Sequence, residues 1–262
     1  MISNRFIEHV RQQRWAGVFI ELFIVVFGVF IGIQASNWNT AREEKIKGGE
    51  VAQRLLQDLR VDLRDREHMV AYYRAVDSSA EKTVALLKSP APDPKALVVN
   101  AFRATEYNYF PTTRATWDEV ISSGELGTLP RRLDMSDISN FFNYDSLRDD
   151  SNNMVASPYR MRVRRIIPHA VQQAIRAGCS DRINQLGYVV GFKPDCQLTV
   201  SDAEITAGAA ALRNDPELLP DLRLHFSVLT NARNDLGSDV IILRRAIASF
   251  DGKAAQPEAG KP

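Results

Sequence analysis

The residues that most often carry metal or acid–base chemistry are scarce in this chain, which has four histidines and two cysteines among 262 residues. Asp65 and His68 stand three residues apart, so a helix would place them on one face, a spacing that metal sites in helical bundles use. Such sites need several contributions of this kind, and His169 and His225 have no carboxylate at a matching spacing. We therefore interpret Asp65 and His68 as part of a solvated helix face, and we predict neither a metal site nor a cofactor.

Cys179 and Cys196 have sixteen residues between them and lie in one segment that contains glycine and proline. They can form a disulfide if this part of the chain is exported, and closing such a loop contributes about 3 kcal/mol in the chain-entropy model. Two unrelated buried thiols are the alternative. The sequence has no phosphate loop, nucleophile elbow or dinucleotide fingerprint, so we name no catalytic residue.

Four arginines, at positions 160, 162, 164 and 165, form a basic cluster between two prolines. Such a cluster could bind lipid head groups or an acidic partner, but a surface with salt bridges is the favoured interpretation. The chain as a whole carries 33 Lys and Arg against 32 Asp and Glu, a net charge of +1. This balance argues against a nucleic-acid partner, because nucleic-acid binders are usually markedly basic.

The segment Trp15–Ile33 contains one charged residue, Glu21, among apolar ones. As a helix it would cover about 28 Å, close to the hydrocarbon thickness of a bilayer. A cleaved signal peptide is the alternative, but its apolar region is usually only about 7–15 residues long, and no good cleavage site follows. The sequence therefore predicts a retained transmembrane anchor over residues 15–38, with the lipid bilayer as its partner.

Gly17, Glu21, Gly28 and Gly32 fall on one face of this predicted helix. Small residues four apart let a second helix approach closely, and a carboxyl on the same stripe would face that helix rather than lipid. We therefore predict self-association through the anchor, and hence a homo-oligomer. The alternative interpretation is a protonated or snorkelling carboxyl with no role in association.

The orientation of the anchor is not decided by counting charges, since three Lys and Arg precede it and four follow within fifteen residues of Asn39. Long domains cross membranes largely regardless of their charge, whereas a short tail is governed by its own. This favours a cytoplasmic basic tail, residues 1–14, and a main domain on the outer side.

Two patches carry a family likeness. The first is the glycine-rich anchor, which ends in Gln-x-x-x-Trp-Asn, and the second is an aromatic and acidic helix that ends in Ser-Ser-Gly-x-Leu. The matching residues are Gln34, Trp38, Asn39, Trp117, Glu119, Gly124 and Leu126. On these residues the chain resembles a bacterial single-pass, membrane-anchored family of unknown function. The resemblance implies an inner-membrane anchor with a periplasmic domain, and it implies no reaction.

The rest of the sequence predicts an all-α protein, a long-helix bundle that follows the transmembrane helix. Apolar residues at three- and four-residue steps predict one helix over 40–88, which Gly48–Gly49 would interrupt as a hinge and the proline-rich run 89–94 would end. Further helices are expected over 94–103, 116–123, 135–154, 201–213 and 216–250. No stretch alternates in the manner of a strand, and the first and last long helices are expected to pair antiparallel.

Local signals place the helix ends. Thr116 with Glu119, and Ser201 with Glu204, have capping-box spacing, and Gly124 fits a left-handed helix stop. The helical extramembrane domain is predicted to span 39–250, with a disordered tail over 251–262.

These features predict a membrane-anchored, non-enzymatic helical protein of the bacterial envelope that acts in interaction, sensing or scaffolding, with a protein partner the sequence does not identify. One alternative is an oligomeric proton conduit or stator-like component that uses Glu21. Another is a membrane-tethered enzyme with a site that sequence motifs do not reveal, because fold and anchor do not fix function.

Overall fold

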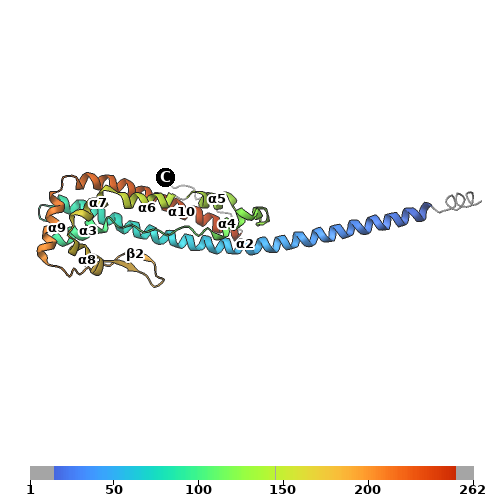
Figure 1. Cartoon of the computed structure of the whole chain (residues 1–262), viewed down its shortest axis with the longest axis horizontal. Helices are drawn as coiled ribbons and strands as arrows, with labels where there is room; N and C mark the ends of the chain where they lie inside the picture. Colours follow the sequence, from blue (N-terminus) through green and yellow to red (C-terminus); the bar gives the residue numbers. More distant parts are fainter. Residues whose placement is uncertain (1–14, 145, 252–262) are drawn as a thin grey trace, which may run out of the picture. The chain divides into compact units, whose positions relative to one another are not determined.

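The computed structural model describes residues 15–144 and 146–251, and it is mostly helical (Figure 1). The predicted cytoplasmic tail, 1–14, lies outside the described residues, as does all but the first residue of the predicted disordered tail, 251–262. The described chain forms two compact units. The first comprises the described part of Met1–Gln53 together with Val120–Pro130, and the second comprises Arg54–Glu119 with the described part of Arg131–Pro262.

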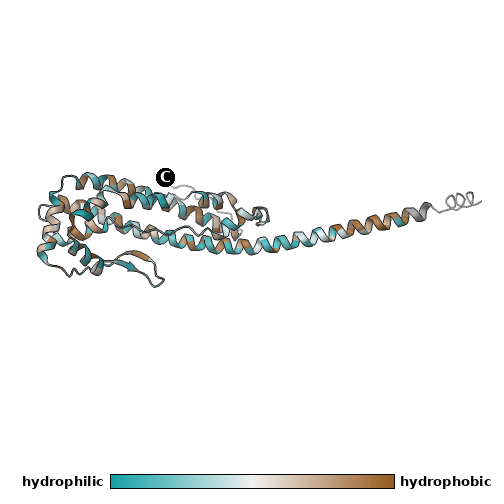
Figure 2. Ribbon diagram, viewed as in Figure 1, coloured by the Kyte–Doolittle hydropathy of each residue, from teal (hydrophilic) through white to brown (hydrophobic). Residues whose placement is uncertain are grey.

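The first unit contains the apolar part of helix α2, which runs from Trp15 to Lys88. Its large apolar side chains from Phe19 to Ile33 are between 51% and 66% exposed. Figure 2 shows this stretch as an almost continuous hydrophobic run. Among the described residues, α2 is the one helix that is long enough and apolar enough to cross a membrane. None of its apolar stretch is buried within the protein.

Helix α2 continues without a break through Gly48 and Gly49, so the prediction of a hinge there is wrong. Gly48 is explained instead by packing, because a Cβ on it would lie 2.1 Å from the carbonyl oxygen of Thr128. Thr128 ends the 3₁₀ helix η1, Glu125–Thr128, whose Glu125 forms an ion pair with Lys47. A side chain at position 48 would displace this segment, whereas nothing lies within 4 Å of a Cβ on Gly49.

The second unit is a bundle built on residues 54–88 of α2. The other helices of the chain are α3 (Pro94–Arg103), α4 (Ala115–Ser123), α5 (Met135–Asn143), α6 (Ser146–Ala156), α7 (Pro158–Ile166), α8 (His169–Gly178), α9 (Asp202–Asn214) and α10 (Leu218–Phe250). Helices α5, α6 and α7 contact α10, and α9 contacts α3, α7 and α8. Figure 1 shows α10 running alongside α6 and α7.

The first and last long helices pair antiparallel, as predicted. Arg233 of α10 forms an ion pair with Asp77 of α2, and Arg244, further along α10, bonds Glu67, which lies earlier in α2. Ser201 caps the start of α9 as predicted, because its hydroxyl accepts a hydrogen bond from the backbone N–H of Glu204. The Glu204 carboxylate accepts from this hydroxyl rather than from the backbone N–H of Ser201, so the reciprocal bond of a capping box is replaced.

Three local predictions are wrong. Residues 135–154 form two helices, α5 and α6, rather than one. Thr116 is not a cap, since it is buried inside α4. The segment after α8 contains a two-stranded antiparallel hairpin, β1 (Asp181–Ile183) and β2 (Val189–Phe192), too short to show as alternation in the sequence.

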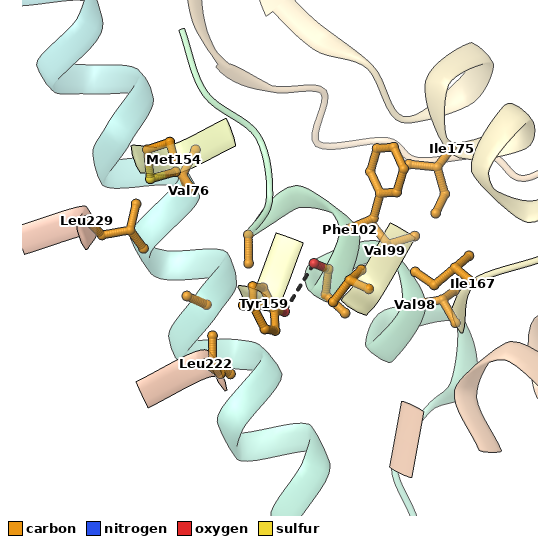
Figure 3. Close-up of a cluster of buried hydrophobic side chains, with 14 of the residues drawn as sticks. Val76, Val98, Val99, Phe102, Met154, Tyr159, Ile167, Ile175, Leu222 and Leu229 are labelled. Atoms are coloured by element: carbon orange, nitrogen blue, oxygen red, sulfur yellow. Dashed lines mark hydrogen bonds between the residues drawn. The ribbon is translucent and has the colours of Figure 1, made fainter. Parts of the chain in front are cut away.

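The apolar core joins α2 to α3, α7 and α10. Figure 3 shows Val76 of α2 near Leu229 of α10, and Phe102 of α3 beside Ile175 of α8. The Tyr159 hydroxyl donates a hydrogen bond of 3.1 Å to the carbonyl oxygen of Ala101, drawn as the dashed line in Figure 3. Because the ring is fully buried, this bond satisfies the polar end of a side chain whose remaining surface is apolar.

Two charged side chains, Arg66 and Asp62, are buried as deeply as the apolar core. The Arg66 guanidinium, 1% exposed, donates to the Asp239 carboxylate at 3.2 Å, to the carbonyl oxygen of Phe110 at 3.0 Å and to the Thr112 hydroxyl at 2.8 Å. Asp62, one turn earlier in α2, accepts a hydrogen bond from the backbone N–H of Thr113 at 3.0 Å. This cluster ties α2, the connector before α4 and α10 into one network.

The contact of Gly48 with Thr128 predicts opposite outcomes for two neighbouring substitutions. Gly48→Ala should displace 125–130 and loosen the backbone at the adjacent Arg131 and Arg132, whose side chains are already exposed, so trypsin should cleave there several times faster. Gly49→Ala meets no atom and adds helix propensity of about 1 kcal/mol, so cleavage should be unchanged or slower. Timed proteolysis of the detergent-solubilised protein compares the two, and equal cleavage rates would contradict the close contact.

Removing the buried guanidinium should be costly. We expect Arg66→Ala to lower the free energy of unfolding by about 3–5 kcal/mol, since it removes the charge that neutralises Asp62 and Asp239 in the interior. The matched control is Arg244→Ala, which removes an exposed ion pair between the same two helices and should cost about 1 kcal/mol or less. Denaturant unfolding in detergent measures both, and a similar loss in the two variants would refute the role given to Arg66.

Candidate functional site

The predicted association residues of the anchor make no contact that identifies a site. Gly17 lies within α2, Glu21 is exposed, and nothing lies within 4 Å of a Cβ placed on Gly28 or Gly32. This face therefore has room for another helix to approach. Self-association through it stays a prediction.

Of the residues that carry the family likeness, three lie on the exposed surface of α2. Gln34 and Trp38 are solvent-exposed, and Asn39 donates a hydrogen bond to Glu43 at 2.7 Å. Arg42 lies over the Trp38 ring, with its guanidinium carbon 5.9 Å from the ring centroid. These contacts are local to one helix and form no pocket.

The other residues of the likeness have structural roles. Trp117 is buried and its ring stacks on Phe142 at 5.0 Å. Glu119 forms a two-pronged ion pair with Arg54, at 2.8 and 3.0 Å.

In the first unit, Gly124 has a φ of 72°, the left-handed conformation predicted for a helix stop. Leu126, in η1, is 42% exposed. Neither residue adds to a pocket.

Cys179 and Cys196 are joined in a disulfide, with their Cα atoms 4.5 Å apart. The bridge links the end of α8 to the segment after β2, so it closes the loop that carries the hairpin. Gly178 precedes the first cysteine, and a Cβ on it would lie 1.7 Å from the Gln197 carbonyl oxygen. Only glycine allows the end of α8 to lie this close to the returning chain.

A partly open pocket of about 200 Å³ lies beside the disulfide. It is formed where α3, α8 and the hairpin meet. Its lining consists of Phe102, Arg103, Glu106, Ile175, Arg176, Cys179, Ser180, Asp181 and Phe192. Figure 3 shows two of these residues, Phe102 and Ile175, side by side in the buried apolar cluster. Convergent charged groups beside aromatic rings in a concavity are the usual features of a small-molecule site.

Two of the lining arginines retain unused donors. Arg103 donates through one Nη to the carbonyl oxygens of Cys179 and Lys193, at 3.0 and 2.8 Å, while its buried Nε–H has no partner among the described residues. Burial lowers the pKa of this guanidinium, and Asp181 opposes that effect. Arg176 lies 5.5 Å from the centroid of the Phe102 ring and bonds no acceptor in the described chain.

The lining carboxylates, in contrast, already have partners. Glu106 forms an ion pair with Arg164 at 2.6 Å, and Asp181 accepts a hydrogen bond from the Tyr72 hydroxyl at 3.0 Å. Burial raises the pKa of Asp181, and the Tyr72 bond and the Arg103 charge oppose this shift. The groups still available to a ligand are therefore hydrogen-bond donors.

The basic cluster predicted as a salt-bridged surface supplies part of this environment. Arg162 bonds Asp221 and Asp215, and Arg164 bonds Glu106. The Arg164 guanidinium also lies 3.6 Å from the Phe102 ring centroid, on a ring that Arg176 approaches as well. The favoured interpretation of the cluster is thus confirmed for Arg162 and Arg164.

No group of three metal-ligating side chains that includes Asp65 or His68 occurs among the described residues. The interpretation of a solvated face is nevertheless wrong for Asp65, which is buried. His68 is half-buried, because its ring stacks on Tyr188 of the hairpin at 4.1 Å and its Nε2 lies 3.1 Å from the amide of Asn184.

A serine and a histidine meet in the core, a contact that sequence reasoning missed. Ser157 and His225 lie 2.8 Å apart, and the other ring nitrogen of His225 bonds the carbonyl oxygen of Ala104. Burial lowers the pKa of His225 to about 4. Both side chains are almost completely buried, so this pair has no access to a substrate and is a satisfied core contact.

An acidic cluster of aspartates lies between α6 and α10. Burial, and then the nearby charge of Asp235, raise the pKa of Asp150 to about 6, and Asp149 and Asp239 add to this shift. Tyr73 of α2 faces the same carboxyl, and its pKa is raised as well, mainly by burial. Nothing in this cluster points to a ligand.

No protein-family model, no curated protein and no solved structure matches this chain. The pocket beside the disulfide is therefore the candidate site on its geometry alone. Sequence analysis singled out Cys179, which lines the pocket, and Arg164, which bonds the lining residue Glu106. It missed the other lining residues, because they come from three segments and share no local motif.

The raised pKa of Asp150 predicts how stability depends on pH. The folded state binds this proton more tightly than the unfolded state, so the contribution is full below pH 3.8 and is lost as the pH rises through about 6. Asp150→Asn should therefore raise the unfolding temperature by several degrees at pH 8 and give no gain at pH 4. Thermal unfolding at both values tests this. The control, Glu81→Gln at an exposed position of α2 that does not contribute to this shift, should change little, and a gain that is independent of pH would contradict the titration of Asp150.

Proposed function

We propose that this protein is a single-pass protein of the bacterial inner membrane, with its tail 1–14 in the cytoplasm and its helical domain in the periplasm. The domain acts as a non-enzymatic binding and sensing module. The observation that carries the anchoring is the exposure of every large apolar side chain from Phe19 to Ile33. Water would strongly disfavour such a surface, whereas a bilayer accommodates it.

The disulfide supports export of the domain, because disulfides persist in oxidising compartments and are rare in the cytosol. The same placement follows from the resemblance of the anchor and of the 116–126 segment to the membrane-anchored bacterial family. We include that membership in the proposal.

The chemistry of the pocket supports binding rather than catalysis. Its lining contains no histidine and no free thiol, and its two carboxylates, Glu106 and Asp181, are already bonded to Arg164 and Tyr72. The buried pair of Ser157 and His225 is closed to solvent. A module that binds a ligand or a protein partner needs only shape and complementary charge, which this pocket offers.

Self-association through the anchor belongs to the same proposal. Gly28 and Gly32 leave space for a second helix, and a carboxyl at position 21 on that stripe would be shielded from lipid by the second copy.

The topology can be tested with one added thiol at a time, since the structure describes no free cysteine. We expect Thr230→Cys, on the exposed face of α10, to react with a membrane-impermeant maleimide in intact spheroplasts. Ser3→Cys, the matched variant in the tail, should react only after the membrane is permeabilised. The reverse pattern would place the domain in the cytoplasm. The anchor would be refuted if both variants were labelled without permeabilisation, or if carbonate washing released the protein from the membrane.

A further inference from the structure

We propose that the pocket beside the disulfide binds a small, singly charged organic carboxylate with an apolar or aromatic body. This inference deepens the proposed function and rests on it for the biological role of the ligand, although binding itself does not depend on the topology.

The first argument is the balance of donors and acceptors. The Arg176 guanidinium has no bonded acceptor in the described part of the chain, and the buried Nε–H of Arg103 has none either. An unsatisfied buried N–H is costly, and an acceptor from a ligand would remove that cost. The lining carboxylates are already bonded to Arg164 and Tyr72. The unmet demand in the pocket is therefore for acceptor oxygens.

The second argument concerns the charge that the pocket tolerates. Arg103 and Arg176 supply positive charge, but Glu106 and Asp181 lie in the same lining. A dianion such as a phosphate ester would meet these two carboxylates, whereas a monoanion needs only one guanidinium. The flat two-oxygen shape of a carboxylate also matches the planar fork of donors on arginine.

The third argument concerns the apolar end. Phe102 and Ile175 are almost completely buried, and Phe192 also lines the pocket, with the Arg103 guanidinium carbon 4.9 Å from its ring centroid. This surface would cover a ring or a branched chain. The volume of about 200 Å³ lies below the range of about 300–1,000 Å³ usual for drug-sized ligands, so the occupant is small.

Benzoate is a suitable probe, with benzamide as its uncharged isostere and inorganic phosphate as the competing anion. We expect benzoate to bind the full-length protein in detergent, as measured by saturation-transfer NMR titration, and benzamide and phosphate to bind at least tenfold more weakly. Loss of a charge-assisted hydrogen bond should weaken benzoate binding at least tenfold in Arg176→Gln. Arg176 is exposed, so this change should leave the fold intact.

The matched control is Arg223→Gln, an exposed arginine on α10 outside the pocket lining, which should bind benzoate like the wild type. Ser180→Leu, which fills the pocket from its rim, should also abolish binding. Absence of benzoate binding, equal binding by Arg176→Gln, or stronger binding of phosphate than of benzoate would each overturn the proposal. Benzoate binding by a protein whose domain proves to be cytoplasmic would refute the proposed topology and leave the carboxylate site standing.

Discussion

The architecture of the helical domain depends on the burial of one arginine. The Arg66 guanidinium has only hydrogen-bond donors, so the interior must supply acceptors around it. The acceptors are Asp239 on α10 and, on the connector before α4, the carbonyl oxygen of Phe110 and the hydroxyl of Thr112. A shift of α10 along α2 by one turn would break this arrangement. The network therefore specifies the register of the two longest helices, which apolar contacts alone would leave less sharply defined.

The same charge accounts for much of the polar core around it. Asp62 and Asp239 are the carboxylates that it neutralises, although burial still keeps the pKa of Asp62 raised. At the α6 and α10 interface, burial and then the nearby charge of Asp235 raise the pKa of Asp150. Acid is thus expected to favour the folded domain at this interface, the reverse of the usual behaviour of salt-bridged carboxylates. The packing of α6 is the part of the bundle most sensitive to the state of these acids.

Sequence reasoning recovered the elements that local signals define. Helix ends at Asp93–Pro94 and Ser201 follow from cap chemistry, and the long helices follow from apolar periodicity. It failed where distant contacts decide. Arg66 lies in a run of charged residues that is typical of a solvated helix face. The sequence at Gly48 suggests a hinge, and only the structure shows that the backbone of Thr128 packs against this glycine. The break between α5 and α6 carries no proline or glycine to announce it, and the hairpin is too short to alternate.

The candidate site shows why the disulfide matters beyond stability. Cys179 is both a wall of the pocket and, through its carbonyl oxygen, an acceptor for Arg103, and the bridge ties it to the chain that returns from β2. Gly178 allows that chain to lie against the end of α8. In a reducing compartment the unfolded chain would regain conformational freedom worth about 3 kcal/mol, so the folded arrangement that holds Ser180 and Asp181 in place would be less stable. The formation of the pocket is therefore linked to the compartment, so a domain that uses this site has a physical reason to lie on the oxidising side of a membrane.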